Sequence, residues 1–351
     1  MRTNVPPVTR ALILLTCSFS FICAAARWNT SATAADGSAV PPDRLIPYPT
    51  LVPSKSLYYP WTVLTSIFVE ENILNFFINT AAVYLSGRYL ERAWGSKDFA
   101  IVALIGAVIP NLLVIPTYVL WGIITLDTTR ADTPIAGAIT LQAAFLVAFK
   151  QLVPEHTVSL YKGLIKIRVK HFPAIFLLLN TFSGVVFGTD TALLLAWYGL
   201  VVTWIYLRFF KYQPELGTST GGLRLKGDAS ETFAFATFFP NAVQPPIAAI
   251  CDQIYIFCCN VKILRPFSDE AVASSNEQAA LRGEDALPTV MSRDLGARPI
   301  SKREEAERRR ALALKALDER LNAANSQTPT SISTAPAANT DQAHSQSSTT
   351  T

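Results

Sequence analysis

Long apolar stretches separated by short polar ones fill the chain up to about Phe210, and the pattern changes after that point. A bilayer core about 30 Å thick requires ~17–25 predominantly apolar residues per helix. Six stretches come near this length, at about residues 11–26, 62–86, 99–126, 135–153, 174–188 and 192–210. The pattern therefore predicts an all-α polytopic membrane protein whose six-helix transmembrane bundle occupies residues 1–212.

The first stretch, ALILLTCSFSFICAAA, has two interpretations. A basic start, an apolar core and small residues at the end are typical of a cleaved signal peptide. However, Pro6 and Pro7 are unusual at the start of a signal peptide, and the later spans pair better with a retained first helix. We therefore expect residues 11–26 to remain as the first span.

Two features constrain the later spans. Pro110 and Pro116 interrupt the long third stretch, and such prolines favour a broken helix. The fifth and sixth stretches are separated only by the turn Gly188-Thr189-Asp190, so we expect their helices to be antiparallel neighbours.

Lysine and arginine in the short loops predict the orientation, because cytosolic loops carry an excess of both. Loops 87–98 and 154–172 hold three and four of these residues, whereas the other short loops hold only Arg130. The two basic loops are therefore predicted to be cytosolic. Six spans then place both termini in the cytosol.

The segment 213–265 is predicted to stay close to the membrane. Its FAFATFFP motif alternates aromatic with small residues, and residues 243–264 are apolar but begin at Pro245 and Pro246. Because about 18 residues follow Pro246 and polar side chains interrupt them, we expect an interfacial helix, with a seventh span as the alternative. The segment contains three cysteines, Cys251, Cys258 and Cys259. They are interpreted either as palmitoylation sites or as buried small hydrophobic residues.

Beyond this segment the sequence predicts a cytosolic C-terminal tail that is partly helical and partly disordered. Residues 266–300 are expected to be a linker and residues 301–322 a helix, because Ser301 and Glu304 form a capping box. A narrow apolar stripe of Leu314, Leu317 and Leu321 fits either a solvated helix or a helix that docks on a partner. Residues 323–351 are rich in Ser, Thr, Ala and Gln and are predicted to be disordered.

Composition supports this division and narrows the chemistry. Half of the residues are hydrophobic, 16% are charged and the mean hydropathy is +0.29, whereas soluble domains carry about 25% charge. The five cysteines form no Cys-x-x-Cys or Cys/His metal pattern, and none of the three histidines lies in an apolar stretch. We expect no metal, no cofactor, no nucleic-acid partner and no histidine-based catalysis inside the membrane.

Two apolar stretches carry polar or small residues that their hydrophobic neighbours do not explain: FVEENILNFFIN (68–79) and PIAGAITL (134–141). The first, together with the Leu90-Glu91-x-x-x-Gly95 pattern, resembles the second helix of rhomboid intramembrane proteases and the turn after it. In active rhomboids that helix carries two histidines and an asparagine that help to stabilise the oxyanion. Here the aligned positions are Glu70, Asn75 and Asn79, so both histidines are absent.

The second stretch resembles the rhomboid nucleophile motif, Gly-x-Ser-Gly, with Ala136 in place of the serine and Gly137 after it. The stretch LLLAWYGLVVTWIYL resembles the last core helix, where Ala196 or Trp197 occupies the place of the catalytic histidine. Acyl transfer needs a nucleophile and a base within hydrogen-bond reach, and neither is present at these positions. A structural role in helix packing remains for four residues: Asn75, Asn79, Gly137 and Gly199.

The motifs ETFAFATFFPNAVQPP and EEAERRRALALKALDERL are similar to the transmembrane protein 115 family, whose members have rhomboid-like topology. The resemblance covers roughly residues 6–321. It implies a catalytically inactive Golgi membrane protein that acts in retrograde transport from the Golgi to the endoplasmic reticulum. It also implies self-association as a homo-oligomer and binding to the conserved oligomeric Golgi tethering complex through the cytosolic tail.

The predicted function is therefore that of a non-catalytic Golgi membrane scaffold. We expect the tail stripe to contact a partner. We expect an aromatic patch either to dock the tail or to pack inside the molecule, and this patch consists of Phe233, Phe235, Phe238 and Phe239. One alternative is a transporter or channel that uses Glu70 and Glu71, since acids within a membrane are functional candidates. Another is an intramembrane hydrolase with a non-standard nucleophile among Ser66, Ser86, Thr140 and Ser183. No histidine or lysine lies in a span beside these residues except Lys150, at a helix end.

Overall fold

The computed structural model describes residues 5–33, 49–154, 156–160, 165–212, 226–264 and 266–285. All of these belong to one compact unit, residues 1–290. The predicted tail helix at 301–322, its stripe residues Leu314, Leu317 and Leu321, and the predicted disorder at 323–351 lie outside the described residues.

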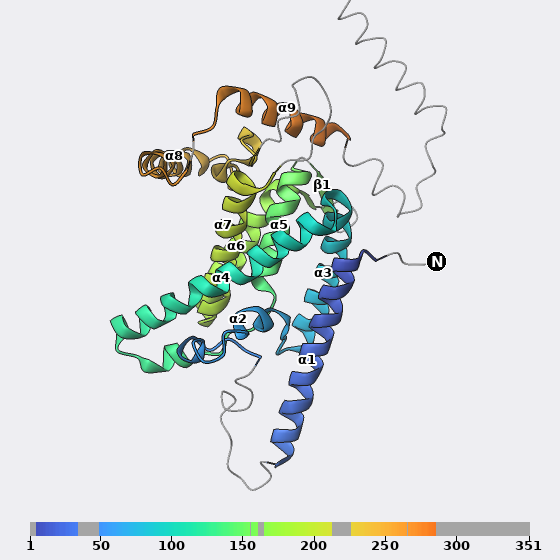
Figure 1. Cartoon of the computed structure of the whole chain (residues 1–351), viewed down its shortest axis with the longest axis vertical. Coiled ribbons are helices and arrows are strands. Elements are labelled where there is room, and N and C mark those ends of the chain that lie inside the picture. Colours follow the sequence, from blue (N-terminus) through green and yellow to red (C-terminus); the bar gives the residue numbers. More distant parts are fainter. Residues whose placement is uncertain are drawn as a thin grey trace, which may run out of the picture. The chain divides into compact units, whose positions relative to one another are not determined.

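Within the described residues, six helices form the bundle (Figure 1). They are α1 (Pro7–Thr33), α3 (Ile73–Trp94), α4 (Ser96–Thr125), α5 (Ile139–Leu152), α6 (Phe172–Phe187) and α7 (Asp190–Ile205). Helix α7 continues as a π-helical turn, η8 (Tyr206–Phe210). The predicted helical class is therefore confirmed, and each of these helices overlaps one of the six predicted spans.

The predicted second span, 62–86, is not one helix. Short turns α2 (Thr62–Thr65) and η4 (Ser66–Phe68) come first, Val69–Asn72 is not helical, and α3 then begins at Ile73. At this break the Glu70 carboxylate is turned inward to two polar partners, the Asn79 amide and the Ala138 N–H. The fourth span also starts later than predicted, because residues 134–138 form a turn before α5.

The third span runs without a break through both of its prolines, contrary to the sequence-based expectation. Helix α4 includes Pro110 and Pro116 and ends at Thr125, and Leu126, which follows it, has a φ of +57°. Packing against neighbouring helices allows proline inside a membrane helix, and Pro110 is buried. Helices α6 and α7 contact each other as predicted, and the indole N–H of Trp197 donates to Thr181 Oγ1 at 3.0 Å.

Shorter elements connect the bundle helices. Turns η3 (Pro53–Lys55) and η5 (Thr128–Asp132) lie at one end, and Leu51 pairs with Ile135 in an isolated β-bridge. At the other end, β1 (Thr157–Leu160) and β2 (Ile165–Arg168) form an antiparallel hairpin that the sequence did not predict, and η7 (Val169–His171) follows it.

After α7, a segment at residues 226–239 returns along the bundle. It contains η9 (Glu231–Phe233) and η10 (Phe235–Phe238), and it leads into α8 (Gln244–Asn260). The predicted linker 266–300 contains one further described helix, α9 (Asp269–Asp285).

The two largest of three core clusters in the described part of the chain both include residues of α4 and α5. One joins α3, α4 and α5 through Leu90, Phe99 and Phe145, whose last two rings stack with centroids 5.6 Å apart. The other joins α5, α6, α7 and the returning segment through Leu200, Leu207 and Phe238. The returning segment is therefore part of the core.

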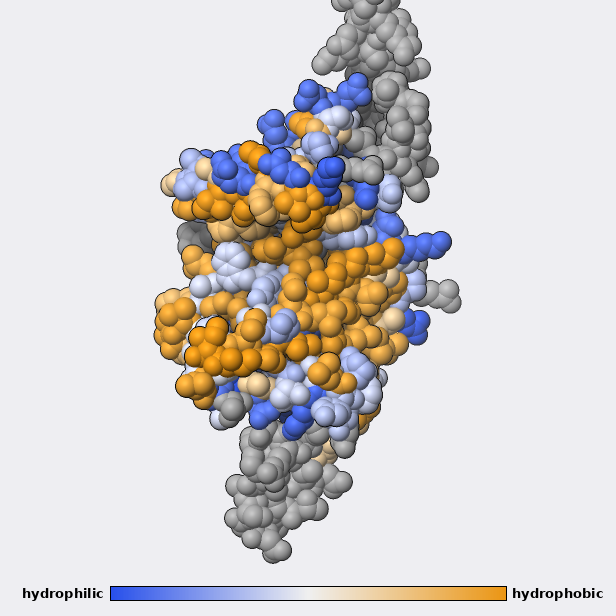
Figure 2. Space-filling model, turned by 60° about the vertical axis from the view of Figure 1, so that its left-hand side comes forward, coloured by the Kyte–Doolittle hydropathy of each residue, from blue (hydrophilic) through white to orange (hydrophobic). Residues whose placement is uncertain are grey.

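Length and composition identify four helical segments able to cross a membrane among the described residues: Pro7–Trp28, Ser96–Thr125, Val169–Phe187 and Asp190–Phe210. Helix α5 is apolar but shorter. A broad hydrophobic band lies between hydrophilic surfaces in the space-filling view (Figure 2). The molecule is thus an integral, multi-pass membrane protein, while the crossing of the membrane by α3 and α5 remains a prediction.

Candidate functional site

A cluster of polar groups lies inside the bundle where the segments before α3 and α5 meet. Glu70 Oε1 accepts hydrogen bonds from the side-chain amide of Asn79 and from the backbone N–H of Ala138, the latter at 3.0 Å. The side-chain oxygen of Asn79 accepts in turn from the amide of Gln142. Residues from three separate segments therefore form one continuous hydrogen-bonded chain, to which we refer as the Glu70 cluster.

Gly137 gives the Glu70 cluster its backbone donor. Its φ is +111°, a region that residues with a Cβ rarely adopt, and its N–H donates to the Ser66 carbonyl at 3.0 Å. The next N–H, that of Ala138, thereby points at Glu70. Gly137 was predicted to pack between helices, and the structure corrects this because the residue lies in the turn before α5.

The other predicted packing residues have different surroundings. Asn79 is buried in the Glu70 cluster, whereas Asn75 is exposed on the surface of α3, and its role in helix packing stays a prediction. Gly199 is buried on α7 against α5, and a Cβ there would lie 3.0 Å from both Cα and the carbonyl O of Thr140. Gln142 and Ser20 were missed, although each is a polar residue in an apolar stretch.

Replacing Gly199 by alanine is expected to lower the free energy of unfolding by about 2 kcal/mol, because the methyl group would press on the backbone of α5. The measurement is an unfolding titration of the purified protein in detergent. Val185→Ala is the control, since Val185 is 76% exposed on the surface of α6 and its replacement should change the free energy of unfolding by less than about 0.5 kcal/mol. Equal effects of the two variants would contradict close packing of α5 on α7.

The positions that resemble the rhomboid nucleophile and base carry no reactive group. Ala136 is half-buried in the turn before α5, and Ala196 is buried on α7. The Trp197 indole is bonded to Thr181 and has no basic nitrogen to accept a proton. Asn79 stands at a position that the resemblance links to oxyanion stabilisation, and its amide is bonded to the chain's own Glu70, as is the Ala138 N–H.

Two of the alternative nucleophiles are held in local contacts. Ser66 Oγ accepts from the Asn111 amide at 3.1 Å, and Ser183 Oγ shares a 2.7 Å hydrogen bond with Thr189. Thr140 Oγ1 is buried with no hydrogen-bond partner among the described residues. Across the described ranges, no group of three or more His, Cys, Asp or Glu side chains could hold a metal ion.

Replacing Glu70 by alanine is expected to lower the free energy of unfolding by about 2–3 kcal/mol, because it leaves the Ala138 N–H and the Asn79 amide without their acceptor. Glu71→Ala is the matched control in the same unfolding titration. Glu71 pairs with Arg27 at 2.8 Å on the surface, and such a pair contributes under about 1 kcal/mol. A larger loss for Glu71→Ala than for Glu70→Ala would refute the assignment of Glu70 as the structural acceptor.

The returning segment is fixed to the ends of α5 and α7 by buried polar contacts that the sequence did not reveal. Lys150 Nζ donates to Thr237 Oγ1 at 2.7 Å and lies 3.3 Å from the centroid of the Phe238 ring. Gln151 donates to Asp228 Oδ2 at 2.9 Å. Lys150, considered above as a base for a hydrolase, is therefore engaged near the C-terminal end of α5, about two helical turns from the Glu70 cluster's Gln142 donor.

Helix α7 and its π-turn hold the same segment from a second direction. The Arg208 guanidinium donates to the carbonyl oxygens of Asp228 and Ser230 at 2.7 and 2.6 Å. The indole N–H of Trp204 donates to the carbonyl of Phe233 at 3.0 Å. These bonds satisfy backbone groups that would otherwise be buried without a partner.

The aromatic patch is part of this layer. Phe233 and Phe238 are buried, while Phe235 and Phe239 are half-buried and pack against the same core cluster. For Phe233 and Phe238 the alternative of packing inside the molecule therefore holds, and a partner could reach only Phe235 and Phe239.

Helix α1 is anchored through its first turn. The carboxylate of Glu91 accepts from the backbone N–H groups of Val8 and Thr9 at 2.9 and 2.7 Å, and from the hydroxyls of Thr9 and Ser96 at 2.8 and 2.7 Å. Thr9 fits against Gly87, where a Cβ would approach Thr9 Oγ1 to 2.7 Å. The Glu91 position in the Leu-Glu-x-x-x-Gly pattern thus provides an N-terminal cap for a helix more than 80 residues away.

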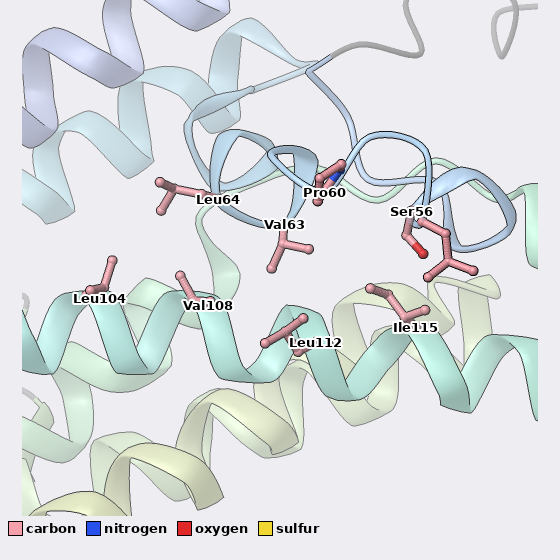
Figure 3. Close-up of a pocket in the computed structure, with 9 residues that line it drawn as sticks. Ser56, Pro60, Val63, Leu64, Leu104, Val108, Leu112 and Ile115 are labelled. Carbon is pink, nitrogen blue, oxygen red and sulfur yellow. The ribbon is translucent and has the colours of Figure 1, made fainter.

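An apolar groove of about 640 Å³ opens between α4 and the segment that precedes α3 (Figure 3). Side chains of α4 face those of the preceding segment across it: Leu104, Val108, Leu112 and Ile115 against Pro60, Val63 and Leu64. The Ser56 hydroxyl at its edge already donates to the Pro53 carbonyl at 2.8 Å. The groove offers contact to hydrocarbon and little hydrogen bonding.

These features define a class. The protein is a membrane protein of the rhomboid-like kind. It is a multi-pass helical bundle in which a glycine turn faces the polar start of a helix. It has no serine or histidine at the positions that resemble the rhomboid nucleophile and base. The sequence matches the family described as "Eukaryotic integral membrane protein (DUF1751)" over residues 10–323. The chain belongs to this family, which is that of transmembrane protein 115.

Curated relatives agree with this assignment. Rhomboid-like protein 19 of Arabidopsis thaliana is 30% identical over 268 residues, which cover 75% of this chain and 82% of the relative. The transmembrane protein 115 homolog of Saccharomyces cerevisiae is 30% identical over 77% of this chain and 79% of its own. Transmembrane protein 115 of Bos taurus is 30% identical over 75% of this chain and 68% of its own.

Proposed function

We propose that the protein is a non-catalytic scaffold of the Golgi membrane. In this proposal it acts in vesicle-mediated retrograde transport from the Golgi to the endoplasmic reticulum and recruits tethering machinery through its cytosolic tail. The observation that carries the non-catalytic part is the Glu70 cluster. Its two donors point at an internal carboxylate, and the neighbouring positions Ala136, Ala196 and Trp197 supply neither nucleophile nor base.

A carboxylate in this place is unfavourable for acyl transfer. Catalysis of this kind stabilises negative charge that develops on a substrate oxygen, and it needs free donors aimed at that oxygen. Glu70 already brings an acceptor to both donors. A substrate carbonyl would have to displace a bonded carboxylate before it could reach them.

The rest of the bundle suits anchoring. Its lipid-facing helices expose large apolar side chains, and its grooves are apolar enough to accept a transmembrane segment of a client. The Golgi location, the homo-oligomer and the tethering complex as partner are proposed from the resemblance to the transmembrane protein 115 family.

The scaffold proposal is tested by co-precipitation of the tethering complex with tagged full-length protein from detergent-solubilised Golgi membranes. Replacing Leu314, Leu317 and Leu321 together by aspartate should abolish capture, because it places charge on the stripe proposed to contact the partner. Replacing Leu312, on the same segment but outside the stripe, is the matched control and should leave capture unchanged. Capture unaffected by the triple substitution would refute the tail stripe as the contact.

Two further measurements separate the proposal from its rivals. A protease-sensitive tag after Thr351 should be cleaved in sealed Golgi vesicles, because the tail must reach cytosolic tethers. A serine-directed fluorophosphonate probe should leave the protein unlabelled. Protection of the tag would contradict a cytosolic tail, and labelling that disappears on a Ser→Ala substitution would establish an enzyme.

A further inference from the structure

Helix α8 has an apolar face that nothing in the described part of the chain covers. No residue of α8 is buried, and four large apolar side chains in and just after it are each more than half exposed: Ile250, Ile254, Phe257 and Val261. At about 100° per residue, these positions fall within about 60° of one another around the helix. They form one stripe along its length.

Polar groups mark the other side of the helix. Asp252 lies about 200° around from Ile250, and Gln253 and Asn260 also lie outside the stripe. Asp252 and Gln253 are exposed. Ile256 is an exposed apolar residue on the polar side and is the one exception among these residues. The helix is therefore amphipathic, and water suits one face and hydrocarbon the other.

A third face holds α8 to the bundle. The rings of Phe209, Tyr255 and Phe267 stack on one another, with centroids 5.4–6.3 Å apart, and the Tyr255 hydroxyl accepts from the Phe267 N–H at 3.0 Å. At the start of α8, the Gln244 amide donates to the Phe239 carbonyl at 2.9 Å. These contacts fix the rotation of the helix, so the apolar stripe is presented in one defined direction.

The surroundings of α8 fit a helix that lies at a membrane surface. Helix α8 is seen nearly end-on in Figure 1, so its axis crosses the direction of α5, α6 and α7. In Figure 2, where the left side of Figure 1 has come forward, the upper surface is hydrophilic outside and hydrophobic on the side toward the apolar band. Its 17 residues span about 25 Å, which is shorter than a bilayer core of about 30 Å.

We propose that α8 lies in the plane of the membrane, with the stripe of Ile250, Ile254, Phe257 and Val261 in the acyl-chain boundary of one leaflet. The occupant of the face is the lipid surface itself. It is the leaflet next to the basic loops 87–98 and 154–172, because α8 follows the end of α7 that lies with the β1–β2 hairpin (Figure 1). The proposal does not depend on the proposed trafficking function.

The test is spin-label accessibility in the full-length protein, reconstituted in phosphatidylcholine liposomes after its five cysteines have been replaced by alanine. Single cysteines for labelling are placed at Ile250, Ile254 and Phe257 on the stripe, and at Asp252 and Ile256 on the other side. Oxygen, which concentrates in the bilayer, should relax the three stripe labels, whereas a water-soluble nickel chelate should relax the other two. Labels at Leu112 on α4 and at Glu277 on α9 serve as the lipid and water references.

Other arrangements give other patterns. A seventh membrane span would make all five labels accessible to oxygen and none to the chelate. Docking on a second copy or on another protein would hide the stripe from both reagents, and a helix free in water would expose all five labels to the chelate. Each of these results would overturn the proposal, and the Leu112 reference shows in the same preparation that the bundle is inserted.

Discussion

Replacing Glu91 by alanine is expected to lower the free energy of unfolding by about 4 kcal/mol, the largest loss we predict for a single side chain. Two backbone N–H groups at the start of α1 and two hydroxyls depend on this carboxylate. Each buried N–H left without an acceptor costs about 1–3 kcal/mol, while hydroxyls can rotate toward other acceptors. The measurement is an unfolding titration in detergent, followed by tryptophan fluorescence.

Glu91→Gln is the matched control, because it keeps one side-chain oxygen as an acceptor but removes the charge. We expect it to cost about half as much, since hydrogen bonds to a charged group are stronger than those to a neutral one. Thr9→Val removes one of the four donors and should cost less again. If Glu91→Ala unfolds at the same denaturant concentration as the unaltered protein, the carboxylate does not anchor α1.

This result also concerns the fate of the first helix. Thr9, Thr16, Ser20 and Cys23 are all buried along α1, and Ser20 accepts from the Glu70 N–H at 3.1 Å while it donates to the Phe68 carbonyl. A segment that supplies buried partners to two other parts of the bundle is expected to stay in the mature protein. We therefore propose that residues 11–26 are retained.

Replacing Gly227 by alanine is the second large effect, with an expected loss of about 3 kcal/mol or more. The φ of Gly227 is +85°, and a Cβ there would overlap the carbonyl oxygen of Arg208. Its N–H also donates to the Lys211 carbonyl at 2.7 Å. The backbone cannot move aside, because Asp228, the next residue, is bonded to Arg208 and Gln151.

Gly188→Ala separates conformation from contact in the same titration. The φ of Gly188 is +69°, but nothing lies within 4 Å of its Cβ position. Left-handed backbone alone costs a residue with a Cβ about 1–2 kcal/mol. Equal losses for the two variants would contradict a steric role for Gly227.

A second readout locates the damage caused by Gly227→Ala. Amide hydrogen exchange in peptides that cover residues 228–239 should become faster, because the segment loses its register against α5 and α7. Exchange in peptides of α4 should stay unchanged. Uniformly faster exchange would mean that the segment is not a separate layer and that the whole bundle unfolds as one unit.

The returning segment illustrates the limit of sequence reasoning. Its aromatic motif FAFATFFP was visible in the sequence, and so was Lys150 at the end of an apolar stretch. Nothing in either pattern indicated that Lys150 bonds to Thr237, 87 residues later. The polar partners of a buried lysine are set by which segments fold together, and hydropathy carries no information on that.

The break before α3 shows the same limit at shorter range. Residues 62–86 are apolar enough to be taken for one helix, and the two acids at Glu70 and Glu71 do not by themselves end it. The chain leaves the helical path because Glu70 has partners on α3 and on the turn before α5, the second of which lies 68 residues away. Only the folded molecule supplies these donors.

The sequence by itself determined that this is a helical membrane protein of the transmembrane protein 115 family, and that Ala136, Ala196 and Trp197 stand where a rhomboid protease would have its reactive groups. Hydropathy, helix length and residue identity are local properties, so they can be read from the chain directly. Only the tertiary structure decided that Glu91 caps α1, that Glu70 bonds to the Ala138 N–H, and that Phe233 and Phe238 are buried. Each of these depends on groups far apart in the sequence, which meet because burial of apolar surface brings their helices together and buried polar groups must then find partners.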